Sequence, residues 1–202
     1  FGTLVSVDRP DDPAAAIAEE LSARGVAVPT DWATVYRPRH IDAPAGAEVP
    51  LPAHVAAALR SRAVQAPNNA ARPALVSAFY PAVRTRDGAV RAGAAAREAG
   101  SGGLVSNCSV PELVGRTLAR ADLSRSGFDA IVTSVGCGWR KPHEQVCTTA
   151  ADVLDTAPDR IVHVGDDPAT DGAIEAVDGQ FVDVREVPLT TVATRLDSGE
   201  WP

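Results

Sequence analysis

The second half of the chain alternates short apolar runs with longer amphipathic segments. Buried strands are expected at 103–106, 130–134, 161–164 and 180–184. Helices are expected around them, at 87–99, 111–121, 142–154, 169–177 and 189–196. Apolar strands that alternate with helices predict a parallel sheet with helices on its faces, so the expected fold class is α/β with a Rossmann-like core.

The first part of the chain has helical patterns almost throughout. Residues 1–5 are apolar and read as the end of a strand that enters a loop. Helices are then expected at 14–24, 29–37 and 52–65, with a proline-containing loop over 38–52. We therefore expect residues 8–73 to form a small helical cap, inserted into an α/β core that consists of residues 1–7 and 74–202.

Acidic residues gather where the expected strand 161–164 ends. Gly165 allows a tight turn there, and Asp166, Asp167 and Asp171 follow it. Ligands of open α/β sheets bind at the carboxyl ends of the strands, and crowded carboxylates favour a hard cation such as Mg²⁺. The alternative is a solvated acidic loop that caps the next helix.

Composition limits the classes of function. A net charge of −7 argues against a nucleic-acid-binding surface. No run of about 18 apolar residues is present, so no membrane span is expected, and no signal peptide is visible. Cys108, Cys137 and Cys147 lack the spacing of a zinc site, and we expect them to be reduced thiols in a cytoplasmic protein.

Two features of composition bear on the site. The chain has no methionine and opens on Phe1, so we expect that its true N-terminus is missing. Lys141 is the one lysine among 19 basic residues. A chain that uses arginine almost everywhere has kept one ammonium group, which makes Lys141 a candidate functional residue.

Four short motifs follow one another at the expected strand ends. They are Gly2-Thr3-Leu4, Ser106-Asn107, Lys141-Pro142, and Gly165-Asp166-Asp167 with Asp171. This ordered set resembles the haloacid dehalogenase superfamily of hydrolases, and the resemblance spans almost the whole chain. It implies that Gly2-Thr3 is the tail of the first motif, whose nucleophilic Asp would lie two residues before Phe1.

The resemblance also implies roles for the other motifs. Ser106 and Asn107 would hydrogen-bond the transferring group, and Lys141 would hold the nucleophile and a phosphate oxygen. Asp166 would hold Mg²⁺, with Asp167 and Asp171 as further ligands or as groups that orient the site. Gly2 and Thr3 would bind substrate. The implied partner is a small anionic molecule, and nothing in the sequence indicates an oligomeric state.

Phe1 departs from the pattern of the phosphatases in that superfamily, because it occupies the position of their general acid, and phenylalanine cannot donate a proton. The acidic cluster favours a Mg²⁺-dependent phosphatase that acts through an aspartyl-phosphate, since clustered carboxylates are costly to bury without a cation. The first alternative is a 2-haloacid dehalogenase, a branch with an aromatic residue at this position. The second is a catalytically weak binding or regulatory protein.

Aromatic and basic residues of the expected cap give a further candidate cluster. Its members are Trp32, Tyr36, Arg37, Arg39 and His40. Trp32 and Tyr36 are four residues apart, so we favour packing on one helix face, with the arginines solvated, over binding of an anion. Trp139, next to Arg140 and Lys141, is the better candidate for a wall of the site.

Overall fold

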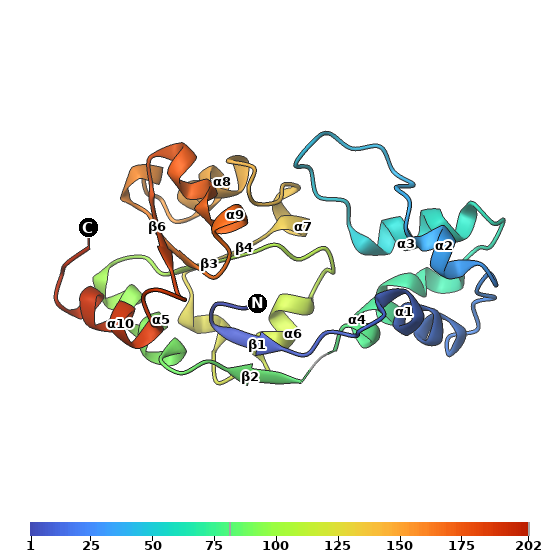
Figure 1. The fold of residues 1–202 in the computed structure, drawn as a ribbon, viewed down its shortest axis with the longest axis horizontal. Helices are drawn as coiled ribbons and strands as arrows, with labels where there is room; N and C mark the ends of the chain where they lie inside the picture. The colour runs from blue at the N-terminus through green and yellow to red at the C-terminus, as the bar shows by residue number, and fades with distance from the viewer. Residues whose placement is uncertain (81, 202) are drawn as a thin grey trace.

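The computed structural model describes residues 1–80 and 82–201, apart from the side chain of Asn68. Residues 81 and 202 of the expected core lie outside the described residues. Figure 1 shows an α/β part on one side, within which the N-terminus lies, and a helical part on the other. Within the described residues, no helix combines the length and the apolar character needed to cross a membrane.

The α/β part contains two pairs of parallel strands, as the apolar runs predict. β3 (Gly103–Ser106) pairs with β4 (Ala130–Thr133), and β5 (Val162–Gly165) pairs with β6 (Gln180–Asp183). Each strand lies within one residue of its predicted position, because its apolar run is bounded by polar residues or glycine.

A third, antiparallel pair was not predicted. It joins β1 (Val5–Val7) to β2 (Val83–Thr85), with Val5 opposite Thr85. The expected strand end at residues 1–5 is therefore wrong in its bounds, since only Val5 belongs to a strand. Strands of three residues are too short to produce a periodic pattern in the sequence.

Helices cover both faces of the parallel strands. α5 (Ala89–Ala99) and α10 (Leu189–Asp197) pack together with Val182 of β6 and with Val184 just after that strand. α8 (Gln145–Val153) covers the opposite side, where its Val146 packs with Val132 of β4. The remaining helical elements of this part are α6 (Leu113–Leu118), η2 (Arg125–Gly127), α7 (Ser134–Cys137), η3 (Pro158–Arg160), α9 (Pro168–Asp171) and η4 (Gly172–Val177).

The expected helix at 169–177 is divided into α9 and the 3₁₀ helix η4. Gly172 stands at the junction of the two elements, and glycine is a poor residue for a helix interior. The chain turns there immediately after the acidic cluster. The helix that was expected over 142–154 begins only at Gln145, after the loop that contains Lys141.

The helical part consists of α1 (Pro13–Ser22), α2 (Trp32–Tyr36), α3 (Leu51–Arg60), η1 (Pro67–Asn69) and α4 (Ala71–Ala78). Its core contains Ile17, Leu21, Leu59 and Leu75, all fully buried. α4 continues to Ala78, through the expected cap boundary after residue 73. The sequence does not mark this boundary because α4 has the same Ala-rich pattern on both sides of it.

A long loop, residues 37–50, leaves α2 and crosses to the α/β part before it returns to α3 (Figure 1). We call it the strap. Ala47 lies opposite Trp139 in an antiparallel bridge. The Glu48 amide donates to the Gly138 carbonyl at 2.8 Å, and the Arg140 amide donates to the Gly46 carbonyl at 2.9 Å. The strap is therefore attached to the residues that immediately precede Lys141.

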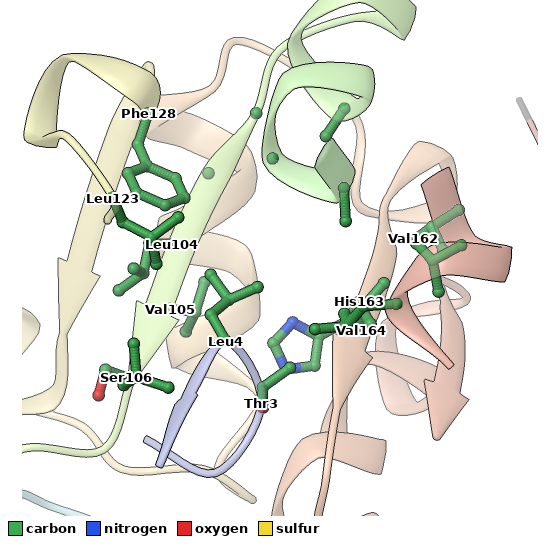
Figure 2. Close-up of a pocket in the computed structure, with 18 of the residues that line it drawn as sticks. Thr3, Leu4, Leu104, Val105, Ser106, Leu123, Phe128, Val162, His163 and Val164 are labelled. Carbon is green, nitrogen blue, oxygen red and sulfur yellow. The ribbon is translucent and has the colours of Figure 1, made fainter. Parts of the chain in front are cut away.

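The two parallel pairs are not hydrogen-bonded to each other. A cavity of about 210 Å³ separates β3 from β5 and is lined largely by apolar side chains. We call it the core cavity. Figure 2 shows Leu104 and Val105 of β3 on one side of it and Val162 and Val164 of β5 on the other. Thr3 and Leu4 lie between the strands, so the start of the chain lies at this cavity.

Candidate active site

Lys141 and Asp171 form a buried ion pair at the carboxyl ends of β4 and β5. The Lys141 Nζ lies 2.5 Å from the Asp171 Oδ1, and the two residues are 8% and 5% exposed. The Lys141 ammonium also donates to the Val105 carbonyl at 3.4 Å. Burial removes solvent screening, so this pair is electrostatically stronger than a surface ion pair.

His163 completes this group, and the sequence analysis did not identify it. Its Nε2 lies 3.2 Å from the Asp171 Oδ1 and 3.4 Å from the Lys141 Nζ. Burial lowers the pKa of His163, although the hydrogen bond to Asp171 opposes the change. Its position within the apolar run 161–164 hid it, because a single polar residue in a buried strand carries no signal of its own.

Asp171 is an organising residue of the loop after β5. Its Oδ2 accepts hydrogen bonds from the amides of Asp166 and Asp167, at 3.0 and 3.1 Å. A Cβ atom at Gly165 would clash with the Asp171 carboxylate, so glycine is required there. Burial alone would raise the pKa of Asp171, but the bonds from His163 and Lys141 outweigh it and hold that pKa far below its usual range.

Asp166 faces the start of the chain. Its Oδ1 accepts a hydrogen bond of 2.6 Å from the Thr3 hydroxyl. Gly2 has a φ of +94°, and a Cβ atom there would clash with the Asp166 carboxylate. The first and fourth motifs therefore meet in space, although Thr3 and Asp166 are 163 residues apart. Glycine at position 2 lets the backbone approach the Asp166 carboxylate closely.

Asp167 instead caps a helix. Its Oδ1 accepts from the Ala169 amide at 3.1 Å and its Oδ2 from the Thr170 hydroxyl at 3.0 Å, at the start of α9. Among the described residues, no group of three or more His, Cys, Asp or Glu side chains is arranged to hold a metal ion. The Oδ2 of Asp166 accepts no hydrogen bond from the described residues, so Asp166 is the carboxylate best suited to a cation.

Asn107 holds the backbone of Lys141. Its side-chain amide donates to the Lys141 carbonyl and its Oδ1 accepts from the Lys141 amide, both at 2.9 Å. Ser106, just before it, is buried and lines the core cavity together with Thr3 and Lys141. The structure thus brings the second and third motifs together, with Asn107 in contact with the backbone of the lysine loop.

Glu48 of the strap is a second residue that the sequence analysis missed. Its buried carboxylate accepts from the Ser134 hydroxyl at 2.5 Å and from the Arg140 guanidinium at 2.9 Å. Arg140 also donates to the Ser109 hydroxyl at 2.9 Å. An isolated glutamate in a proline-containing loop gave no signal in the sequence, because its partners lie 86 and 92 residues away.

In the aromatic and basic cluster of the cap, the aromatic residues pack together and the arginines are exposed. Trp32 is buried, donates its indole N–H to the Ala14 carbonyl and lies 5.6 Å from the Tyr36 ring. Arg37 and Arg39 are exposed. Trp139 stacks on His143 at 4.1 Å between ring centroids, beneath the strap. The packing interpretation of Trp32 and Tyr36 is confirmed by these contacts.

Comparison with solved structures identifies the fold. An L-2-haloacid dehalogenase shares 19% identity with a TM-score of 0.54, covering 91% of this chain and 80% of that one. CbbY from Rhodobacter sphaeroides, solved with phosphate, shares 20% identity with a TM-score of 0.56, and the match covers 90% of this chain and 81% of that one. The L-2-haloacid dehalogenase from Xanthobacter autotrophicus was solved with chloropropionic acid covalently bound. It shares 16% identity with a TM-score of 0.53, and the match covers 100% of this chain and 81% of that one.

No protein-family model and no curated protein sequence matches the chain. The structural likeness nevertheless confirms the predicted architecture, since these neighbours are superimposed over 90% or more of the chain. The protein has the α/β fold of haloacid dehalogenase superfamily hydrolases.

Proposed function

We propose that the protein is a Mg²⁺-dependent hydrolase that removes phosphate from a small phosphorylated metabolite through an aspartyl-phosphate. The observation that supports this proposal best is the contact of Asp166 with Thr3, next to the buried Lys141–Asp171 pair. Phosphoryl transfer to a carboxylate requires positive charge close to two anionic partners, and Lys141 is the ammonium group at this position.

In this proposal the attacking carboxylate belongs to an Asp two residues before Phe1, as the motif order predicts. It forms a bond to phosphorus while the ester oxygen leaves, and water then hydrolyses the acyl phosphate to regenerate the carboxylate. Lys141 orients the nucleophile and a phosphate oxygen, and Ser106 donates a hydrogen bond to the transferring group.

Mg²⁺ would be held by the Asp166 carboxylate together with water and substrate phosphate, which fits the usual preference of this ion for one or two protein carboxylates. When bound, it would neutralise charge on the phosphoryl group. Asp171 holds the loop that presents Asp166, because its oxygens are occupied by Lys141, His163 and two backbone amides. Asp167 contributes by capping α9.

Hydrolysis of a 2-haloacid is the second candidate, and Phe1 is the observation that favours it. Phe1 lines the core cavity at the position of the expected general acid, where it offers an apolar surface and no proton. Similarity of fold does not separate the two activities, since the neighbours include dehalogenases as well as a protein solved with phosphate.

The decisive experiment uses protein expressed from its complete gene. It is incubated with a panel of phosphate esters and with 2-chloropropionate, in Mg²⁺ or in EDTA, and released phosphate and chloride are measured. The proposal predicts phosphate release that EDTA abolishes and that Asp166→Asn removes, with Asp152→Asn on the exposed face of α8 as the matched control. Chloride release that is indifferent to EDTA would establish the dehalogenase instead. Folded protein that releases neither product would support a binding or regulatory role.

A further inference from the structure

A second cavity, of about 200 Å³, shares Phe1 as a lining residue with the core cavity. Besides Phe1, it is lined by Val7 at the end of β1 with residues 8–10, by residues 107–110 after β3 with Leu113 of α6, and by Leu51 and Phe79 from the helical part. We call it the cap cavity. Phe1 lines both cavities, so the cap cavity adjoins the end of the site that contains Thr3, Ser106 and Lys141.

Most polar groups of the cap cavity already have partners. The Asp8 carboxylate accepts from Arg84 at 2.9 Å, which neutralises it. The Asn107 side chain is bonded to the backbone of Lys141. Burial raises the pKa of the Cys108 thiol, which donates to the Val110 carbonyl at 3.3 Å and stays uncharged at neutral pH.

Arg9 is different. It lines the cap cavity, and its guanidinium has no hydrogen bond or ion pair with any residue in the described ranges 1–80 and 82–201. Arg9 is an exposed residue at the rim of the cap cavity, so its guanidinium is open to a ligand that enters there.

We propose that Arg9 forms an anionic subsite that binds a carboxylate on the organic part of the substrate. A planar guanidinium suits a carboxylate because it can donate two parallel hydrogen bonds. The apolar walls formed by Leu51, Phe79 and Val110 suit a short hydrocarbon segment between the two charged ends. The inference rests on the proposed function and narrows its substrate class to phosphate monoesters that carry a carboxylate.

The test measures binding, so that it does not depend on turnover. Alkylphosphonates of two to four carbons are compared by calorimetry, in Mg²⁺, with phosphonates of the same length that end in a carboxylate. At the best chain length, wild-type protein is expected to bind the carboxylated ligand about 10- to 100-fold more tightly, as for a hydrogen-bonded charge pair. Arg9→Gln is expected to abolish this preference, and Arg9→Lys to keep part of it.

Arg60→Gln is the matched control, since Arg60 is an exposed residue at the end of α3 and lines neither cavity. It is expected to keep the full preference. Equal binding of the paired ligands by wild-type protein, or a preference that survives in Arg9→Gln, would overturn the subsite alone. Failure of every phosphonate to bind would overturn both the subsite and the proposed function. Release of chloride in place of phosphate, by protein that still prefers the carboxylated ligand, would overturn the proposed phosphatase function and leave the carboxylate subsite standing.

Discussion

Individual residues of the site hold one another through buried charges. Lys141, His163 and Asp171 come from three different elements and meet at a single carboxylate oxygen. Each group would be costly to bury alone, because a charge or a polar group without a partner loses its hydration. Removing one of these side chains therefore lowers stability mainly because it leaves the remaining groups buried without a partner.

Asp171→Asn tests this dependence. At pH 7 we expect the free energy of unfolding to fall by about 3–5 kcal/mol, since the substitution leaves the Lys141 ammonium buried without a counter-charge. The pKa of Asp171 is lowered in the folded protein, so its contribution is present above the unfolded pKa and is lost as the pH falls. The deficit should shrink by about 1.4 kcal/mol per pH unit below about pH 4. Urea unfolding measures it, with Asp152→Asn as the control, and a deficit that is constant down to pH 3 would contradict the assignment.

His163 makes the free energy of unfolding depend on pH in a second, higher range. Because its folded pKa is lowered, the unfolded chain binds a proton more readily, and stability falls as the pH drops below the unfolded value of about 6.5. We expect the free energy of unfolding to decrease between pH 7.5 and 5.5 in the wild-type protein. His163→Asn should flatten this slope. An equally steep decrease in the variant would show that another group is responsible.

At the scale of the elements, the strap is joined to the loop before Lys141 by several hydrogen bonds. Glu48 bonds to Ser134, the Ser134 hydroxyl accepts from the Cys108 amide at 2.8 Å, and Arg140 connects Glu48 to Ser109. One buried carboxylate thus links the helical part to the ends of both β3 and β4. The strap is positioned by these contacts despite having no regular secondary structure.

Glu48→Ala is expected to release the strap. The substitution leaves the buried Ser134 hydroxyl without its acceptor, which typically costs about 1–3 kcal/mol of stability. The amides of Glu48 and Arg140, which bond across the junction, should exchange with deuterium faster than in the wild-type protein. Glu98→Ala, at an exposed position on α5, is the control. Unchanged exchange at both amides would mean that the backbone bridge holds the strap without Glu48.

The sequence predicts those elements whose signal is local. β3 to β6 follow from apolar runs, and the acidic cluster follows from three carboxylates within six residues. The β1–β2 pair, His163, Glu48 and Arg9 were missed because their importance depends on partners far away in the sequence. The role of Asp171 illustrates the same limit. Its charge is visible in the sequence, but the two amides and the ammonium group that bind it are not.

At the scale of the whole molecule, the core cavity interrupts what would otherwise be one parallel sheet. The Gln180 amide donates to the Ile161 carbonyl and the Val184 amide donates to the Gly165 carbonyl. Alternate residues of β5 therefore face β6, and the peptide groups of Val162 and Val164 point the other way. That side of β5 faces the core cavity and β3 (Figure 2). An extended segment between β3 and β5 would pair with this edge and fill the apolar space.

A segment joined to Phe1 can reach this space, since Phe1 and Thr3 line it. We expect that six added residues rich in Val and Ile, with Asp two residues before Phe1, will raise the free energy of unfolding by about 2–4 kcal/mol. Each buried apolar side chain contributes about 1.5–3 kcal/mol, and ordering each residue costs about 1–2 kcal/mol. The amides of Val162 and Val164 should then exchange more slowly with deuterium.

The matched control carries the same extension with proline at two alternate positions, because proline cannot donate to a strand and is excluded from the interior of a sheet. It should show neither the gain in urea unfolding nor the protection of Val162 and Val164. Equal stabilisation by both extensions would indicate non-specific apolar contact. Stabilisation by the first alone would show that an extended segment joined to Phe1 pairs with the free edge of β5.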